Sequence, residues 1–211
     1  SFPTRRSSDL LGEVPQAMPA LLQIAQSNSS RLHELINDLL DMEKLMAGKM
    51  RYDIREQPIW PLLEDAITHN QPYADQYQVA LELVGHPVEV NVAFDSQRLA
   101  QILANLISNA VKFSPPGSVV TLKASVDHDW LRVSVRDRGI GIKDEFKSRI
   151  FSRFSQADAG DARQKGGTGL GLAICKELIE AMSGRIGYES QEHLGSTFWF
   201  ELPIASQVVK E

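Results

Sequence analysis

Two clusters of glycine residues are the first feature of this sequence that could carry chemistry. One lies between Asp137 and Ile142, at the end of an alternating apolar pattern, and the other lies between Gly166 and Leu172, at the start of a helical pattern. Glycines at the N-terminus of a helix leave backbone N–H groups free to bind phosphate, and the helix dipole assists. Neither cluster fits the GxxxxGKS/T or GxGxxG phosphate-binding patterns. Taken alone, each cluster is more typical of an ordinary turn.

Three polar side chains on a nearby amphipathic segment suggest a second kind of chemistry. Asn105, Asn109 and Lys112 are spaced four and three residues apart, which places them on one face of a helix. Amide oxygens can bind a hydrated Mg²⁺ ion, and an ammonium group can bind phosphate. The spacing therefore predicts a site for a metal-bound triphosphate, although a solvated polar helix face is the simpler interpretation of the same pattern.

The elements that must position these residues form a mixed α/β pattern. Apolar periodicity predicts helices, alternation predicts strands, and prolines and glycines mark their ends. We expect helices at 58–77, at 170–182, and from a cap at Asp95 or Ser96 up to Pro115. We expect strands at 79–83, 88–92, 119–126, 130–136, 185–189 and 197–202, and a short strand or linker at 50–57.

A seven-residue apolar repeat runs from Met18 to Met46 and predicts one long helix. A period of 3.5 residues is typical of a coiled-coil seam, and Asn28 is a polar interruption of the kind that fixes register. The length of the run favours a helix that forms a homodimer with a second copy. A helix packed on its own domain is the alternative.

Composition excludes several classes of protein. The chain has 211 residues, 43% of them hydrophobic and 23% charged, with a net charge of -5, as in folded globular proteins. The acidic excess argues against a nucleic-acid partner. We find no apolar run of about 18 residues and no signal peptide in Ser1 to Leu10. A single cysteine, Cys175, excludes an internal disulfide framework and fits a reducing, cytoplasmic compartment.

The order of these motifs resembles the core of a bacterial sensor histidine kinase over about residues 16–204. Asn105–Phe113 resembles the N box, Asp137–Gly141 the G1 box, Phe151–Phe154 the F box and Gly167–Gly171 the G2 box, and Gly195–Thr197 resembles the closing strand motif. Residues 154–167 resemble the ATP lid of hybrid-type kinases. The resemblance implies the Bergerat-type ATP-binding fold, an α/β (α+β) two-layer sandwich with a mixed sheet and helices on one face, preceded by a long dimerisation helix.

By the same resemblance, the cofactors are ATP and Mg²⁺. Asn109 would be the principal metal ligand with Asn105 in support, and Lys112 would contact phosphate. Asp137 would accept a hydrogen bond from the adenine amino group, supported by Thr197, and Arg153 would contact the terminal phosphate. Asn105, Lys112 and Arg153 are the catalytic candidates. The other residues expected at the nucleotide are Phe113, Gly139, Gly141, Ile142, Gly167, Thr168, Gly169, Leu170 and Gly171.

Asn105 also separates this sequence from hydrolytic relatives. Gyrase-type, chaperone-type and mismatch-repair ATPases of the same fold carry a glutamate there, which activates water as a general base. Asparagine does not accept a proton near neutral pH, so we expect the site to position ATP for a nucleophile other than water. Rapid hydrolysis of ATP is the disfavoured alternative.

The phosphoacceptor histidine of the family lies in a motif like His-Glu-Leu-Arg-Thr-Pro, and no such segment stands before Met18. His33 precedes Glu34 and Leu35, but it falls within the long helix expected from Met18 to Met46, which corresponds to the second helix of the family's helical hairpin and not to the first. We predict a solvated side chain there. Two functions therefore stay open. One is a kinase core that transfers the γ-phosphoryl group of Mg-ATP to a histidine in a two-component relay. The other is a nucleotide-binding, dimerising fragment without autokinase activity.

These expectations divide the chain into five parts. Residues 1–10 resemble a translated sequencing adapter, and we assign no function to them. Residues 11–50 would form the second helix of the dimerisation and phosphotransfer region, 51–57 a linker, 58–204 the catalytic domain and 205–211 a tail. The expected partner is a response regulator or receiver domain, and membrane attachment would come only from upstream regions.

Overall fold

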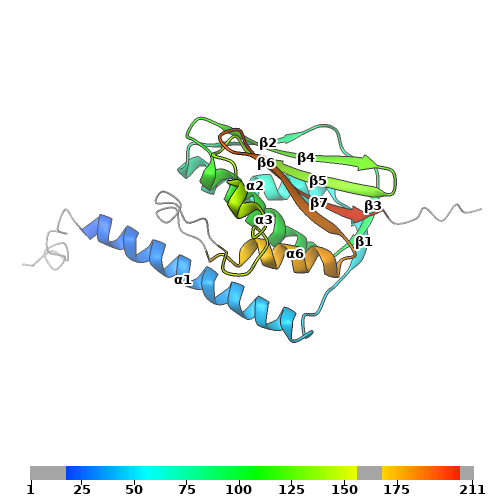
Figure 1. Ribbon diagram of the computed structural model, residues 1–211, viewed down its shortest axis with the longest axis horizontal. Coiled ribbons are helices and arrows are strands. Elements are labelled where there is room, and N and C mark those ends of the chain that lie inside the picture. The colour runs from blue at the N-terminus through cyan, green and yellow to red at the C-terminus, as the bar shows by residue number, and fades with distance from the viewer. Residues whose placement is uncertain (1–17, 156–167, 205–211) are drawn as a thin grey trace, which may run out of the picture.

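The computed structural model describes residues 18–155 and 168–204 (Figure 1). The expected segments 1–10 and 205–211 lie outside the described residues. Helix α1 (Met18–Met46) has the bounds that the heptad pattern predicts, and Gly48, with a φ of 61°, follows its end. Among the described helices, none combines the length and the apolarity that a membrane span requires.

The main sheet has five strands, in the order β2 (Ala80–Val84), β4 (Val119–Asp127), β5 (Trp130–Arg136), β7 (Gly195–Pro203) and β6 (Arg185–Gln191). Strands β2 and β4 are parallel, and the other pairs are antiparallel. Helices α2 (Trp60–Gln76), α3 (Ser96–Phe113) and α6 (Gly171–Ala181) pack against the sheet, and α4 (Asp144–Lys147) is one short turn (Figure 1). The predicted mixed two-layer α/β sandwich is confirmed.

The core lies between the sheet and the helices. On β5, Leu131, Val133 and Val135 are at most 1% exposed, whereas the residues between them face outward and are half-buried. The apolar face of α3 supplies seven buried residues to the same core. Burial of each Leu, Ile or Val side chain in this core stabilises the fold by about 1.5–3 kcal/mol relative to its exposed state. The packing therefore fixes which face of α3 is left for polar groups.

One predicted strand is wrong in its extent. Alternation at Val88, Val90 and Val92 suggests a strand over 88–92, but β3 covers only Asn91–Phe94. It pairs antiparallel with β1 (Arg55–Pro58) in a separate two-stranded sheet, not with the main sheet. Val88 and Val90 pack against the core from an irregular segment. The alternating valines thus indicate partial burial of their side chains, whereas the position of the strand is set by pairing with β1.

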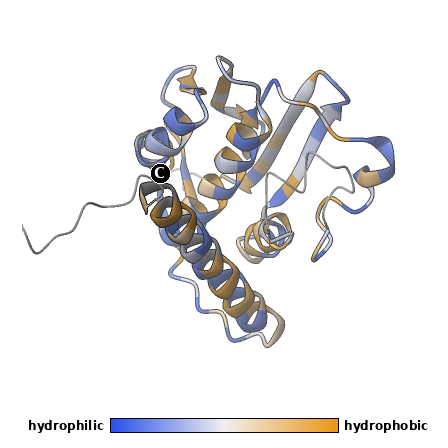
Figure 2. Ribbon diagram, turned by 90° about the vertical axis from the view of Figure 1, so that its left-hand side faces the viewer, coloured by the Kyte–Doolittle hydropathy of each residue, from blue (hydrophilic) through white to orange (hydrophobic). Residues whose placement is uncertain are grey.

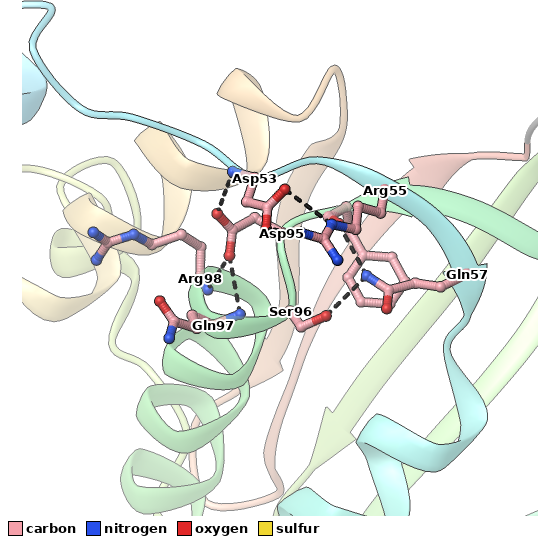
Figure 3. Close-up of polar contacts among 8 residues, drawn as sticks. Asp53, Arg55, Gln57, Asp95, Ser96, Gln97 and Arg98 are labelled. Atoms are coloured by element: carbon pink, nitrogen blue, oxygen red, sulfur yellow. Dashed lines mark hydrogen bonds and ion pairs between the residues drawn. The ribbon is translucent and has the colours of Figure 1, made fainter.

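The start of α3 is tied to the chain that follows α1 (Figure 3). Asp95 is the N-cap residue. Its Oδ1 accepts hydrogen bonds from the backbone N–H groups of Gln97 (2.9 Å) and Arg98 (3.1 Å), and its Oδ2 accepts one from Asp53 (2.8 Å). The Gln57 amide donates to the Ser96 hydroxyl at 2.8 Å. The predicted choice between Asp95 and Ser96 is therefore resolved in favour of Asp95, which anchors both segments.

We predict that Asp95→Ala lowers the free energy of unfolding by about 1–2 kcal/mol at neutral pH. Burial alone would raise the pKa of Asp95, but the N–H groups of Asp53, Arg98 and Gln97 and the Arg98 charge together hold it below its usual value. A lowered pKa gives stability that is present above the unfolded pKa of about 3.9 and is lost as the pH falls through the folded value.

Urea unfolding from neutral pH to about pH 2 measures this effect. Asp53→Ala is the control, because the Asp53 side chain forms an exposed pair with Arg55 and its replacement leaves the backbone N–H in place. We expect the difference between wild type and Asp95→Ala to shrink below about pH 4. A difference that stays constant over the whole range would contradict the assigned cap.

Candidate functional site

The polar face of α3 carries a pair of bonded amides. The Asn109 Nδ2 donates a hydrogen bond of 2.8 Å to the Asn105 Oδ1, one helical turn away. This bond occupies the side-chain oxygen of Asn105. The side-chain oxygen of Asn109 takes no part in it and can accept from, or bind to, another group. Lys112, on the same face, lies with its ammonium 5.0 Å from the centre of the Phe113 ring. The predicted shared face of Asn105, Asn109 and Lys112 thus exists on a helix whose other side is buried.

Both glycine clusters approach this helix closely. A Cβ atom at Gly139 would lie 2.5 Å from the Phe113 carbonyl oxygen, at the C-terminal end of α3. A Cβ atom at Gly171 would lie 2.8 Å from the Asn105 Cγ, so the first residue of α6 packs directly on the amide pair. Any side chain at these positions would push the elements apart. The three segments that the sequence singles out therefore converge at α3.

Asp137 is a buried carboxylate beneath the first cluster. It is 5% exposed, and its Oδ1 accepts hydrogen bonds from the backbone N–H groups of Gly139 (2.7 Å) and Ser196 (3.1 Å). Burial raises the pKa of Asp137, and these two N–H groups only partly offset that rise. Within the described ranges, no cation forms a salt bridge with it. Buried charges in proteins are usually paired, so an unpaired carboxylate here marks a candidate ligand contact.

Ser196, and not Thr197, lies against Asp137. Side chains alternate along β7, and Ser196 shares its inward face with the buried Phe198 and Phe200. Thr197 sits on the opposite face, in register with Arg136 of β5 and Glu189 of β6. Ser196 contacts Asp137 through its backbone N–H, because the pairing of β5 with β7 brings these two residues opposite each other. Ser196 was not among the residues expected at the site, and no local spacing in the sequence indicates this contact.

A second serine connects Ser196 to the first glycine cluster. The Ser190 hydroxyl lies 2.9 Å from the Ser196 hydroxyl and accepts a hydrogen bond of 2.9 Å from the backbone N–H of Ile142. Ile142 itself is partly buried against the core. Strand β6 therefore fixes the end of the loop that begins at Asp137. Ser190 is a further positioning residue, which was not among the residues expected from the sequence.

The second cluster is described from Thr168 onward. The Leu170 N–H donates to the Thr168 hydroxyl oxygen at 3.1 Å, and Leu170 is buried. Gly169 has a φ of 71°, a conformation that favours glycine. Gly167 and residues 156–166 of the expected lid lie outside the described residues.

Arg153 is held toward α1 and α6. Its Nη1 lies 3.2 Å from the Met46 sulfur, and its Nη2 lies 3.6 Å from a carboxylate oxygen of Glu177. Neither partner belongs to the amide face of α3 or to the Asp137 loop. These contacts of Arg153 therefore do not connect it with the other catalytic candidates, Asn105 and Lys112.

The side-chain oxygens of this site suit Mg²⁺ as ligands only if an anion binds with the metal. Asn109 offers a neutral amide oxygen, a ligand type that Mg²⁺ accepts, while the Asn105 oxygen is already hydrogen-bonded. Among the residues that the structure describes, no group of three or more His, Cys, Asp or Glu side chains could hold a metal. Because neutral amides do not balance the charge of a divalent ion, the site suits a metal that arrives bound to phosphates.

Comparison with known sequences gives this geometry a context. Residues 94–206 match a family model described as "Histidine kinase-, DNA gyrase B-, and HSP90-like ATPase". The chain is 40% identical over 206 residues to the sensor protein GacS of Pseudomonas syringae pv. syringae, a match that covers 95% of this chain and 22% of GacS. It is 38% identical over 186 residues to the signal transduction histidine-protein kinase BarA of Escherichia coli (strain K12), over 86% of this chain and 20% of BarA. The chain thus spans about a fifth of the length of these curated relatives.

Solved structures share the fold. Full-length ShkA in complex with AMPPNP superposes with a TM-score of 0.76 and 31% identity, over 92% of this chain and 40% of that chain. The histidine kinase ThkA in complex with the response regulator protein TrrA superposes with a TM-score of 0.71 over 94% of this chain and 54% of that chain. At 23% identity, the second match speaks for the fold alone.

We predict that Gly141→Ala destabilises the protein more than Gly117→Ala. Both glycines have a positive φ, 68° and 79°, so alanine is strained at either position. At Gly117 the added Cβ meets open space, whereas at Gly141 it would lie 2.7 Å from the Gln191 carbonyl carbon. We expect an additional loss of about 1–3 kcal/mol for Gly141→Ala in urea denaturation. Equal losses would contradict the close contact between this loop and β6.

Proposed function

Since the chain belongs to the family of histidine kinase-, DNA gyrase B- and HSP90-like ATPases, we propose that it is the catalytic core of a sensor histidine kinase. In this proposal it binds Mg-ATP and transfers the γ-phosphoryl group to a histidine of a two-component relay. The observation that carries the proposal is the convergence of the amide pair of α3, the buried Asp137 and the glycine at the start of α6.

Adenine would bind above the Asp137 loop. The exocyclic amino group of adenine is a donor, and the carboxylate of Asp137 is an acceptor whose Oδ1 is already oriented by two backbone N–H groups. Gly139 and Gly141 would let the backbone pass beneath the base, with Ile142 and Phe113 beside them. We assign to Ser196 the supporting role first expected of Thr197, because Ser196 is the residue that contacts Asp137.

The phosphates would extend along α3 toward the start of α6. Lys112 would supply a positive charge, and the backbone N–H groups of Gly169 and Gly171 would supply donors at the positive end of the α6 dipole. Bound Mg²⁺ would neutralise phosphate charge, with Asn109 as its protein ligand. Asn105, whose oxygen is engaged by Asn109, would act mainly by orienting that ligand.

The chemistry of this arrangement favours transfer over hydrolysis. Phosphoryl transfer depends chiefly on positioning and on charge neutralisation, which these residues can provide. The position of Asn105 carries no carboxylate that could activate water. His33 is exposed on α1 outside any acceptor motif, so we propose that another segment or chain supplies the acceptor histidine. A nucleotide-binding fragment without autokinase activity is the alternative.

Helix α1 supports a proposed homodimer. Many of its large apolar side chains are exposed, and hydrophobic residues recur along the helix in Figure 2. Those at least 45% exposed are Leu21, Leu22, Ile24, Leu32, Ile36, Leu39, Leu40 and Met46. An apolar stripe of this length is typical of an interface, and a second copy of α1 would cover it. A receiver domain or response regulator as the phosphoryl acceptor, and a cytoplasmic site of action, complete the proposal.

We predict that Asn109→Asp and Asp137→Asn each weaken the binding of Mg-AMPPNP about tenfold or more in calorimetric titration. Asp at position 109 loses the amide donor to Asn105 and adds a negative charge beside the phosphates. Asn at position 137 loses the charged acceptor for the adenine amino group. Because burial raises the pKa of Asp137, the neutral side chain should leave the melting temperature unchanged or higher.

The matched controls are Asn91→Asp and Asp127→Asn, which make the same chemical changes at exposed positions outside the site. We expect both controls to keep the affinity of wild type. Unchanged affinity in both site variants would refute the assigned pocket, and a large fall in melting temperature for Asp137→Asn would show that the carboxylate is structural.

We further predict that γ-labelled ATP leaves no label on the chain alone. Label should appear when a second protein supplies a helix with the acceptor motif, and it should be on that helix as acid-labile phosphohistidine. Label on the isolated chain would contradict our account of the acceptor. Rapid release of inorganic phosphate without the added helix would instead favour a hydrolytic ATPase and would contradict the argument from Asn105.

A further inference from the structure

The C-terminal half of α1 is docked on the catalytic domain beside α6 (Figure 1). Met42 is 4% exposed and belongs to the core. The Asp41 carboxylate accepts a hydrogen bond from the Gln101 amide at 2.9 Å and pairs with the Arg98 guanidinium at 3.3 Å, so it binds α1 to α3. These contacts hold α1 in one position relative to the start of α6.

In that position, Asp38 reaches the second glycine cluster. The Thr168 hydroxyl donates a hydrogen bond of 2.7 Å to the Asp38 Oδ2, and the same oxygen of Thr168 accepts the N–H of Leu170 at 3.1 Å. A hydroxyl has one proton to donate. While Asp38 accepts it, the Thr168 hydroxyl cannot donate to a phosphate oxygen, which is itself only an acceptor.

The charge of Asp38 acts in the same direction as its hydrogen bond. Within residues 18–155 and 168–204, no cation forms a salt bridge with Asp38. Its influence extends into α6, because burial first and the Asp38 charge second raise the pKa of the Cys175 thiol. A partly buried carboxylate at this end of α6 would repel the phosphates of an approaching nucleotide.

We propose that Asp38 competes with the triphosphate of ATP for the Thr168 end of α6, so that docking of α1 through Asp38 and binding of ATP oppose each other. This inference rests on the proposed nucleotide site. By reciprocity of linked equilibria, a movement of α1 that withdraws Asp38 raises the affinity for ATP, and bound ATP loosens the contact between α1 and Thr168. Helix α1 thereby regulates access to the site without touching the adenine subsite.

Calorimetric titration of the full chain with Mg-AMPPNP tests this competition. We expect Asp38→Ala to bind the analogue roughly fivefold more tightly or better than wild type, and Asp38→Asn to shift the affinity in the same direction by less. Adenosine, which lacks phosphates, should bind wild type and both variants equally. Asp127→Asn corrects for the change in net charge, and circular dichroism verifies that each variant is folded.

A double-mutant cycle with Thr168→Val tests whether Asp38 acts through the Thr168 hydroxyl. Valine keeps the shape of threonine but lacks the hydroxyl, so in that background the gain from Asp38→Ala should fall to the smaller part that comes from the Asp38 charge. An affinity for Mg-AMPPNP that is unchanged or weaker in the Asp38 variants, an equal gain for adenosine, or an undiminished gain in the Thr168→Val background would each overturn the inference. Failure of wild type to bind Mg-AMPPNP at all would instead refute the proposed function.

Discussion

Three backbone contacts that leave no room for a Cβ atom hold the site together. Gly139 lies against the Phe113 carbonyl, Gly171 against the Asn105 side chain, and Gly195 against the backbone of Asp137. Each contact joins segments that are far apart in the sequence, and two of them end on α3. These glycines are therefore needed for close approach between elements. Alanine at any of them would strain the contact that the glycine makes, with the end of α3 for Gly139, with the amide pair for Gly171 and with the Asp137 segment for Gly195.

The electrostatic character of the site follows from what is buried there. Asp137 is kept out of water with backbone donors on one oxygen, and its raised pKa records a cost that packing in the rest of the fold must offset. Asn105 and Asn109 add oriented dipoles but no charge. Such a site suits a ligand with a donor edge at one end and a metal-neutralised anion at the other. That combination is the basis for proposing a purine nucleotide with Mg²⁺ as the ligand, and it explains why neither glycine cluster alone is informative.

Sequence reasoning succeeded where a local pattern dictates structure. The heptad repeat predicts the bounds of α1, and the apolar face of α3 predicts which side of that helix remains for Asn105 and Asn109. It failed where the outcome depends on a distant partner. The strand β3 forms where β1 is available to pair with it, and not where valines alternate. The contact between Asp38 and Thr168 joins residues 130 positions apart, so no local spacing could have indicated it. The contact of Ser196 with Asp137 likewise depends on the register between β5 and β7, which the local sequence does not reveal.

The most direct test of the account is an NMR titration of the ¹⁵N-labelled chain with Mg-AMPPNP, followed through backbone amide resonances. The account predicts that shifts appear together, with one shared dissociation constant, in the second half of α3, in the loop from Asp137 to Ile142, and from Thr168 to Leu172. Shifts confined to one of these segments, or distributed over elements that do not meet at α3, would contradict the claim that the three segments form one nucleotide site.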